Sequence, residues 1–220
     1  MKNLTSEQKG FLLSGGDERI DIGENNLNRY LLNPFYYDSL VSRGSCTCNT
    51  LNIDSVALLN TLPQDIDDAD YEKLKSDLRE LFSVQEKRTF ETFLAPSGTD
   101  LVYFPLLFKQ ILERNKKIIY VISCPEELGG GTTVAAAGSF YARKSQFGTH
   151  LNQRGPLNSH LEVELVLLSA RDVDGNIMGH EDAIVSIIEN KEPDTTIIVN
   201  LVIGSKSGIE DNLSLIPKYK

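Results

Sequence analysis

A chain of 220 residues can form one large domain or a domain with an arm, and a net charge of -9 disfavours nucleic acid and anionic membranes as partners. With 40% hydrophobic and 24% charged residues, the composition is typical of a globular protein rather than a disordered one. The N-terminus lacks the apolar core of a signal peptide, and no apolar run approaches the roughly 20 residues of a membrane span. We therefore expect a cytoplasmic protein.

Residues 1–69 are the least regular part of the sequence and predict an arm or cap. They are rich in Asn, Gly and Ser, and their apolar residues show no sustained period from which a separate core could form. The small polar run Gly44–Asn49 could bind a carboxylate through backbone N–H groups, or it could be an ordinary surface loop.

The three cysteines predict reduced thiols and no metal ligands. Cys46 and Cys48 are one residue apart and Cys124 ends an apolar segment, so paired disulfides cannot account for all three. A metal site would normally recruit a second ligand cluster, and the three histidines show no ligand spacing with the cysteine pair. No histidine lies near Cys46 or Cys48 in sequence to activate a thiol, which argues against a nucleophile. The role of these two cysteines stays open.

Residues 70–220 predict an α/β domain with a mostly parallel sheet and flanking helices, because segments with strand and helix patterns alternate. Helices are expected at about 70–82, 101–112, 133–140 and 181–189, and strands at 89–94, 118–123, 161–168 and 195–203. The nearly continuous apolar run at 118–123 is typical of a parallel strand covered on both faces. We expect the still more apolar segment 195–203 to be the most buried of the four strands.

The turn Ser97–Asp100 lies between an expected strand and an expected helix. Gly98 permits positive φ and a close approach of the backbone to a ligand. The first N–H groups of a helix and its dipole suit a phosphate, and the hydroxyls of Ser97 and Thr99 add donors. Ser97 or Thr99 could instead only cap the helix.

Two further junctions follow the next apolar segments. Residues 118–123 lead into Gly129–Thr133, and residues 196–203 lead into Gly204–Gly208. The glycine run at 129–131 could lie over a bound ring, or it could be a turn that makes room for the helix after it.

The order of these junctions from Phe93 to Gly208 resembles the first half of the large domain of fold-type I pyridoxal-phosphate (PLP) enzymes, especially the cysteine desulfurase and class V aminotransferase branch. The resemblance implies a PLP site in which Ser97, Gly98 and Thr99 hold the cofactor phosphate. It also implies that Ser205, with Lys206 as second choice, faces the ring hydroxyl and the substrate.

The sequence departs from that family at the loop over the cofactor ring. The family usually places a His or an aromatic residue there, whereas Glu127 or Leu128 is nearest to that position here and neither supplies a ring. If PLP binds, Glu127 would contact it, and the ring would be held differently or covered by another chain.

The family's Schiff-base lysine and the acidic partner of the pyridine nitrogen lie a few tens of residues beyond the strand that here ends at Ile203. Lys206 comes too early, and Lys218 and Lys220 lie in a polar tail. The resemblance therefore implies no catalytic residue on this chain. It implies a split PLP-dependent enzyme, transferase- or lyase-like and acting on an amino acid or amine.

In such an enzyme, a second polypeptide supplies the C-terminal half of the fold, in an assembly such as a dimer of heterodimers. The alternative is a non-catalytic scaffold or regulatory subunit that resembles a PLP enzyme. A third possibility is that the turn at Ser97 binds another phosphorylated metabolite. The substrate and the reaction type are not set by the sequence, because this family runs several reactions on one scaffold.

Overall fold

The computed structural model of the chain describes residues 4–35, 50, 55, 57–58, 61, 67–83, 91–112, 117–203 and 206–219. The chain divides into two compact units. The first comprises Met1–Pro96 with Gln146–Gly148, and the second comprises Ser97–Ser145 with Thr149–Lys220.

Two helices of the first unit have described bounds. Helix α1 (Ser6–Leu12) begins with a capping box, in which Thr5 and Gln8 each accept the other's backbone N–H. Helix α3 (Asp68–Ser83) confirms the amphipathic helix expected from residue 70, with Asp68 and Asp70 in its first turn, where negative charge interacts favourably with the helix dipole. Two large apolar side chains near its end, Leu81 and Phe82, are exposed.

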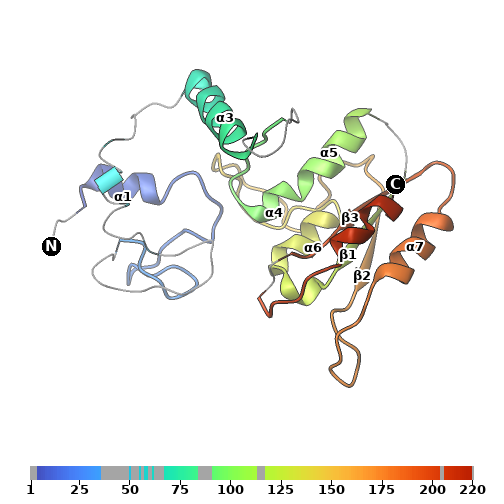
Figure 1. Ribbon diagram of the computed structural model, residues 1–220. Helices are drawn as coiled ribbons and strands as arrows, with labels where there is room; N and C mark the ends of the chain where they lie inside the picture. The colour runs from blue at the N-terminus through green and yellow to red at the C-terminus, as the bar shows by residue number, and fades with distance from the viewer. Residues whose placement is uncertain are drawn as a thin grey trace. The chain divides into compact units, whose positions relative to one another are not determined.

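The second unit is built on a parallel sheet whose described strands are β1 (Lys117–Ser123), β2 (Val163–Leu168) and β3 (Thr195–Asn200) (Figure 1). Their order is β2-β1-β3, and both neighbours run parallel to β1. The expected parallel α/β sheet is confirmed. The most buried of the described strands is β1 rather than β3, because β1 lies between the other two, whereas β3 is at an edge of the described sheet and its side chains are mostly half-buried.

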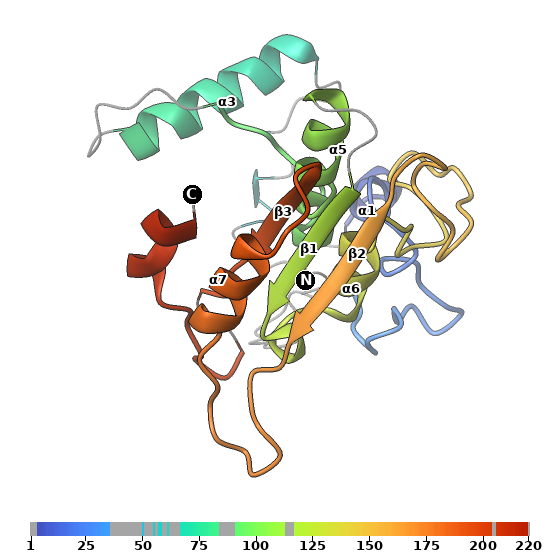
Figure 2. The ribbon, with the colours of Figure 1, turned by 90° about the vertical axis from the view of Figure 1, so that its right-hand side faces the viewer.

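Helices cover both faces of this sheet. On one face, Ile118, Tyr120 and Ile122 of β1 pack in one cluster with Leu106 and Ala135. These last two come from α5 (Tyr103–Leu112), which follows the short helix α4 (Gly98–Leu101), and from α6 (Gly130–Ala136). Figure 2 shows α6 behind the sheet and α7 (Glu181–Glu189) in front of it.

Several expected elements differ from those observed. The strand expected at 161–168 begins at Val163, and the helix expected at 101–112 is preceded by the separate short helix α4. The described part of the strand expected at 89–94, residues 91–94, forms no strand, and the side chain of Phe93 is 56% exposed. The helix expected at 133–140 begins earlier, at Gly130, and ends at Ala136, because Gly138 adopts a φ of 71° that breaks the helix. The strand expected at 195–203 ends at Asn200.

No helix in the described ranges has both the length and the apolar character needed to cross a membrane.

Candidate functional site

The carboxyl ends of the three parallel strands meet at one edge of the sheet. Residues that follow these ends form a buried cluster, namely Cys124 after β1, Ala170 after β2, and Val202 and Ile209 after β3. The segment after β1 enters α6 on one face, whereas the segment after β2 enters α7 on the other. In open α/β sheets, ligands bind where neighbouring connections part in this way.

The turn at Ser97 is the first of the sequence-predicted segments near this edge. Ser97 is the N-cap of α4, and its Oγ accepts the backbone N–H of Asp100 at 3.3 Å. The same hydroxyl donates to Oδ2 of Asp100 at 2.6 Å, and the hydroxyl of Tyr141 donates to that oxygen at 3.0 Å. Ser97 is therefore a helix cap, which was the alternative interpretation of this turn. The Asp100 carboxylate places a negative charge beside the expected phosphate site.

Thr99 is buried, and it lies against the glycine run that follows β1. A Cβ added at Gly131 would come within 3.2 Å of both Cγ2 of Thr99 and Cδ2 of Tyr141. Such contacts are too close for a side chain to fit without movement of its neighbours. Because Gly131 has no side chain, α6 can pack closely against α4. This packing brings the turn 97–99 next to residues 129–131.

The loop after β1 is also joined to the segment after β3. The carboxylate of Glu127 accepts the backbone N–H of Ser207 at 2.9 Å and its hydroxyl at 2.5 Å. Nζ of Lys206 donates to the carbonyl of Leu128 at 2.7 Å. Glu127 thus holds two loops together. Ser205 lies outside the described residues, as do Cys46 and Cys48.

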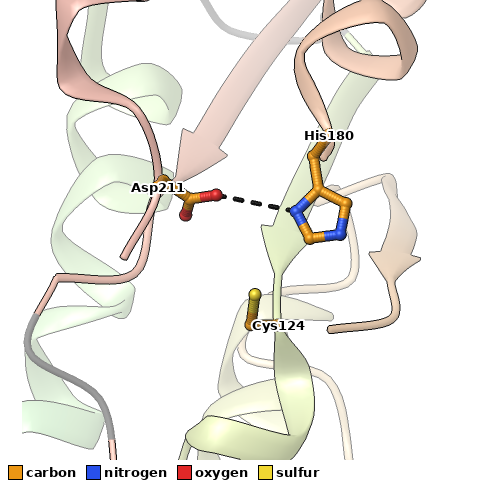
Figure 3. A group of neighbouring side chains, drawn as sticks. All are labelled: Cys124, His180 and Asp211. Atoms are coloured by element: carbon orange, nitrogen blue, oxygen red, sulfur yellow. Dashed lines mark ion pairs between the residues drawn. The ribbon is translucent and has the colours of Figure 1, made fainter. Parts of the chain in front are cut away.

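A second group of polar side chains at this edge comprises Cys124, His180 and Asp211 (Figure 3). Cys124 directly follows β1 with left-handed backbone angles, His180 precedes α7, and Asp211 lies beyond β3. Cys124 is 1% exposed, His180 5%, and the side chain of Asp211 11%. One ligand atom from each residue lies within 4.8 Å of the other two.

Hydrogen bonds fix the orientations of the histidine and the aspartate. Nε2 of His180 is 2.9 Å from the carbonyl oxygen of Ser169, and its Nδ1 is 3.5 Å from Oδ1 of Asp211. The other oxygen of Asp211 accepts the backbone N–H of Val202 at 2.5 Å and the hydroxyl of Ser123. Figure 3 shows the imidazole and the carboxylate facing each other, with the sulfur of Cys124 directed toward the space between them.

The thiol of Cys124 is not activated in this arrangement. Burial raises its pKa to about 11, and the carboxylates of Asp211, Glu126 and Glu127 add to the shift. A nucleophilic triad would also need one imidazole nitrogen on the thiol and the other on the carboxylate. Here Nε2 is taken by the carbonyl of Ser169. The group is therefore better suited to holding a cation than to nucleophilic catalysis.

Sequence reasoning missed this group because its members come from three separate segments. The histidines were compared only with Cys46 and Cys48, whereas His180 meets Cys124 and Asp211 in the fold. The usable signal was positional. Cys124 directly follows an apolar strand and His180 directly precedes a helix, so both stand at junctions that a parallel sheet brings to its carboxyl edge.

Comparisons with protein-family models, with curated proteins and with solved structures found no match. Functional conclusions therefore depend on the site itself.

Proposed function

We propose that residues 97–208 provide the cofactor-phosphate half of the site of a PLP-dependent enzyme that acts on an amino acid or amine. In this proposal the turn formed by Ser97, Gly98 and Thr99 carries the phosphate site, and Ser205 faces the ring. PLP, when bound, would supply an electron sink for reactions at the carbon next to the amino group.

The observation that supports the proposal best is the convergence of the three junction loops. The contact between Gly131 and Thr99 joins the first loop to the second, and the bonds between Glu127 and Ser207 join the second to the third. The second and third loops follow β1 and β3 at the carboxyl edge of the parallel sheet, where α/β proteins bind their ligands, and the first lies against the second. Buried Thr99 and the backbone beside it fit a bound phosphate better than Ser97 does.

The Ser97 hydroxyl fits less well, because it already donates to Asp100. Two hydroxyl donors, from Ser97 and Tyr141, stabilise the Asp100 carboxylate and compensate its charge locally. The phosphate would then be held by the N–H groups that open α4 and by Thr99. Ser97 contributes by fixing the start of the helix.

The rest of the proposed site would come from another polypeptide segment, whether continuous with this chain or separate from it. The lysine that holds the cofactor covalently and the acidic partner of the pyridine nitrogen would both belong to that segment. Among the described residues, Lys206 donates to the carbonyl of Leu128 instead.

A non-catalytic scaffold that resembles a PLP enzyme is the alternative function. Two observations favour it. The Asp100 carboxylate stands beside the expected phosphate position, and Glu127 bonds Ser207, which makes it a link between loops. A scaffold keeps these structural bonds and has no need to bind the cofactor.

A titration with pyridoxine 5′-phosphate tests the proposal on the full chain. This probe lacks the aldehyde of PLP and therefore cannot react with surface lysines. We expect it to bind more tightly than pyridoxine, which lacks the phosphate. Thr99→Val should weaken its binding by about 1.5–3 kcal/mol, the range for a hydrogen bond to a charged group.

Ser97→Ala is the matched control, because Ser97 is the N-cap. It should lower the free energy of unfolding by about 1 kcal/mol and change the affinity for the probe less than Thr99→Val does. Equal affinities for the two pyridoxine compounds, or an affinity that Thr99→Val leaves unchanged, would contradict the cofactor proposal and favour the scaffold.

A further inference from the structure

We propose that Cys124, His180 and Asp211 form a binding site for a divalent transition-metal ion, with zinc as the best match. The site uses none of the residues assigned to the cofactor phosphate. It therefore stands or falls independently of the proposed enzyme function.

The hydrogen bonds of His180 leave two acceptor atoms facing each other. The Ser169 carbonyl can only accept, so the nitrogen at 2.9 Å from it, Nε2, carries the proton. In the neutral ring, Nδ1 is then an unprotonated acceptor, and it faces an Asp211 oxygen at 3.5 Å. Two acceptors this close in a buried place repel each other unless a cation lies between them. The sulfur of Cys124 points into the same space.

The surrounding bonds are those that hold metal ligands in place. A metal-binding histidine almost always donates its other N–H to a carbonyl or carboxylate, as His180 does to Ser169. A ligating carboxylate is likewise held through its second oxygen, which for Asp211 bonds the Val202 N–H and the Ser123 hydroxyl. Both side chains are therefore oriented without using the atoms that would bind the ion.

The spacing of the three donor atoms suits a tetrahedral ion. Zinc bonds of the usual lengths separate neighbouring tetrahedral ligands by roughly 3.4–3.6 Å. The 3.5 Å between His180 Nδ1 and Asp211 Oδ1 matches this spacing. All three donor atoms lie within 4.8 Å of one another, so the sulfur needs to move by only about 1 Å to reach tetrahedral spacing.

The donor set also selects the class of ion. A thiolate, an imidazole and a carboxylate together suit zinc and similar transition metals, whereas magnesium and calcium prefer oxygen ligands alone. Three protein ligands leave one tetrahedral position for water or another donor. The ion would link the segments that follow β1, β2 and β3, and so it would stabilise the carboxyl edge of the sheet.

The rival arrangement is a buried ion pair between a protonated His180 and Asp211. In that case a proton on Nδ1, rather than a metal ion, would separate the two acceptors. The two arrangements differ in an observable way, because only the metal site recruits the sulfur of Cys124.

Cobalt titration of the metal-free chain tests the site. The protein would carry Cys46→Ser and Cys48→Ser, so that Cys124 is its only thiol. We expect one Co²⁺ per chain, with the near-ultraviolet charge-transfer band of a cobalt–thiolate bond and the visible bands of tetrahedral coordination. Zn²⁺ should displace the cobalt and raise the melting temperature, since an ion that binds only the folded state stabilises it.

Two substitutions assign the band to this site. Cys124→Ser should abolish the charge-transfer band. His180→Ala should weaken metal binding by about 100-fold, because changes to outer-shell partners alone cost roughly 10–100-fold. His160→Ala is the matched control, since this exposed histidine lies outside the group, and it should change nothing.

Circular dichroism of each metal-free variant establishes that it is folded. If Cys124→Ser does not fold, Asp211→Asn provides the assignment, because it keeps the shape of the side chain and removes the charged ligand. The proposal is overturned if the folded parent protein shows no cobalt–thiolate band. It is equally overturned if the band survives Cys124→Ser, or if His160→Ala weakens binding as much as His180→Ala.

Discussion

Two polar groups at the carboxyl edge of the sheet satisfy their hydrogen bonds in different ways. Around α4, the acceptor is matched by donors, because the hydroxyls of Ser97 and Tyr141 both donate to the Asp100 carboxylate. In the second group, Nδ1 of His180 lies 3.5 Å from a carboxylate oxygen of Asp211, and in the neutral ring with its proton on Nε2 both atoms are acceptors. The first group is complete by itself, whereas the second requires a proton or a metal ion. Buried sites of the second kind are the stronger candidates for a bound cation.

The contrast is sharpest in the metal-free protein, where Asp211→Asn should change the free energy of unfolding by different amounts under the two explanations of the second group. If His180 is neutral, the new amide can donate to Nδ1 and its oxygen can still accept from Val202. The free energy of unfolding should then change by less than about 1 kcal/mol. If His180 and Asp211 form a buried ion pair, the same change should cost about 3–5 kcal/mol.

Urea unfolding in the presence of a chelator measures this difference. Asp211→Ala is the companion variant, because it leaves the Val202 N–H and the Ser123 hydroxyl without their acceptor and should cost about 1–3 kcal/mol under either explanation. A loss of about 3 kcal/mol or more in Asp211→Asn would show that a proton on Nδ1, rather than two facing acceptors, occupies the metal-free group.

The first group is held by packing as well as by hydrogen bonds, and Gly131→Val tests that packing. The new side chain would meet Thr99 and Tyr141, so we expect α6 to be pushed from α4 at a cost of about 1–3 kcal/mol. Gly130→Val is the matched control, since a Cβ there meets nothing within 4 Å. Chemical denaturation of both variants isolates the contact, and equal losses would show that Gly131 is not needed for close packing.

The same contrast explains what the sequence could predict. Ser97–Asp100 is a contiguous motif, and a local pattern was enough to predict a helix start and to offer Ser97 or Thr99 as its cap, of which the structure shows Ser97. Helix α7 was predicted at its observed bounds, because its apolar residues recur at helical spacing. Strand β1 was predicted within one residue, since a central parallel strand is apolar throughout.

The remaining features depend on tertiary structure that local patterns do not contain. The burial of β3 was overestimated because apolar composition does not tell a central strand from an edge strand. The group of Cys124, His180 and Asp211 could not be predicted from spacing, because strand order alone brings its members together. The expected role of Ser205 stays a prediction, and the role of Cys46 and Cys48 stays open, because all three lie outside the described residues.

The smallest effect that we expect concerns Tyr103, which links α5 to the segment after α6. Its hydroxyl donates to the Ser139 carbonyl at 2.9 Å and accepts the Tyr141 N–H at 3.2 Å. Burial raises the pKa of Tyr103 from 10.0 to about 12; the bond from Tyr141 opposes the shift, and the charge of Asp100 adds to it. The folded protein therefore keeps this proton at pH values where the unfolded chain has lost it.

Stability should consequently fall as the pH rises from about 10 to about 12, because the unfolded state binds fewer protons over that range. Below pH 10, Tyr103 is protonated in both the folded and the unfolded state, so it does not make the free energy of unfolding depend on pH. Tyr103→Phe should remove this part of the alkaline loss, at a cost of about 1 kcal/mol at neutral pH for its hydrogen bonds. Denaturant unfolding of the two proteins across this range provides the test, since the contributions of all other groups cancel in the difference. Parallel curves for the two proteins would mean that the Tyr103 hydroxyl is not buried as described. Tyr103 would then not belong to the hydrogen-bonded group around α4, and that group would end at Tyr141.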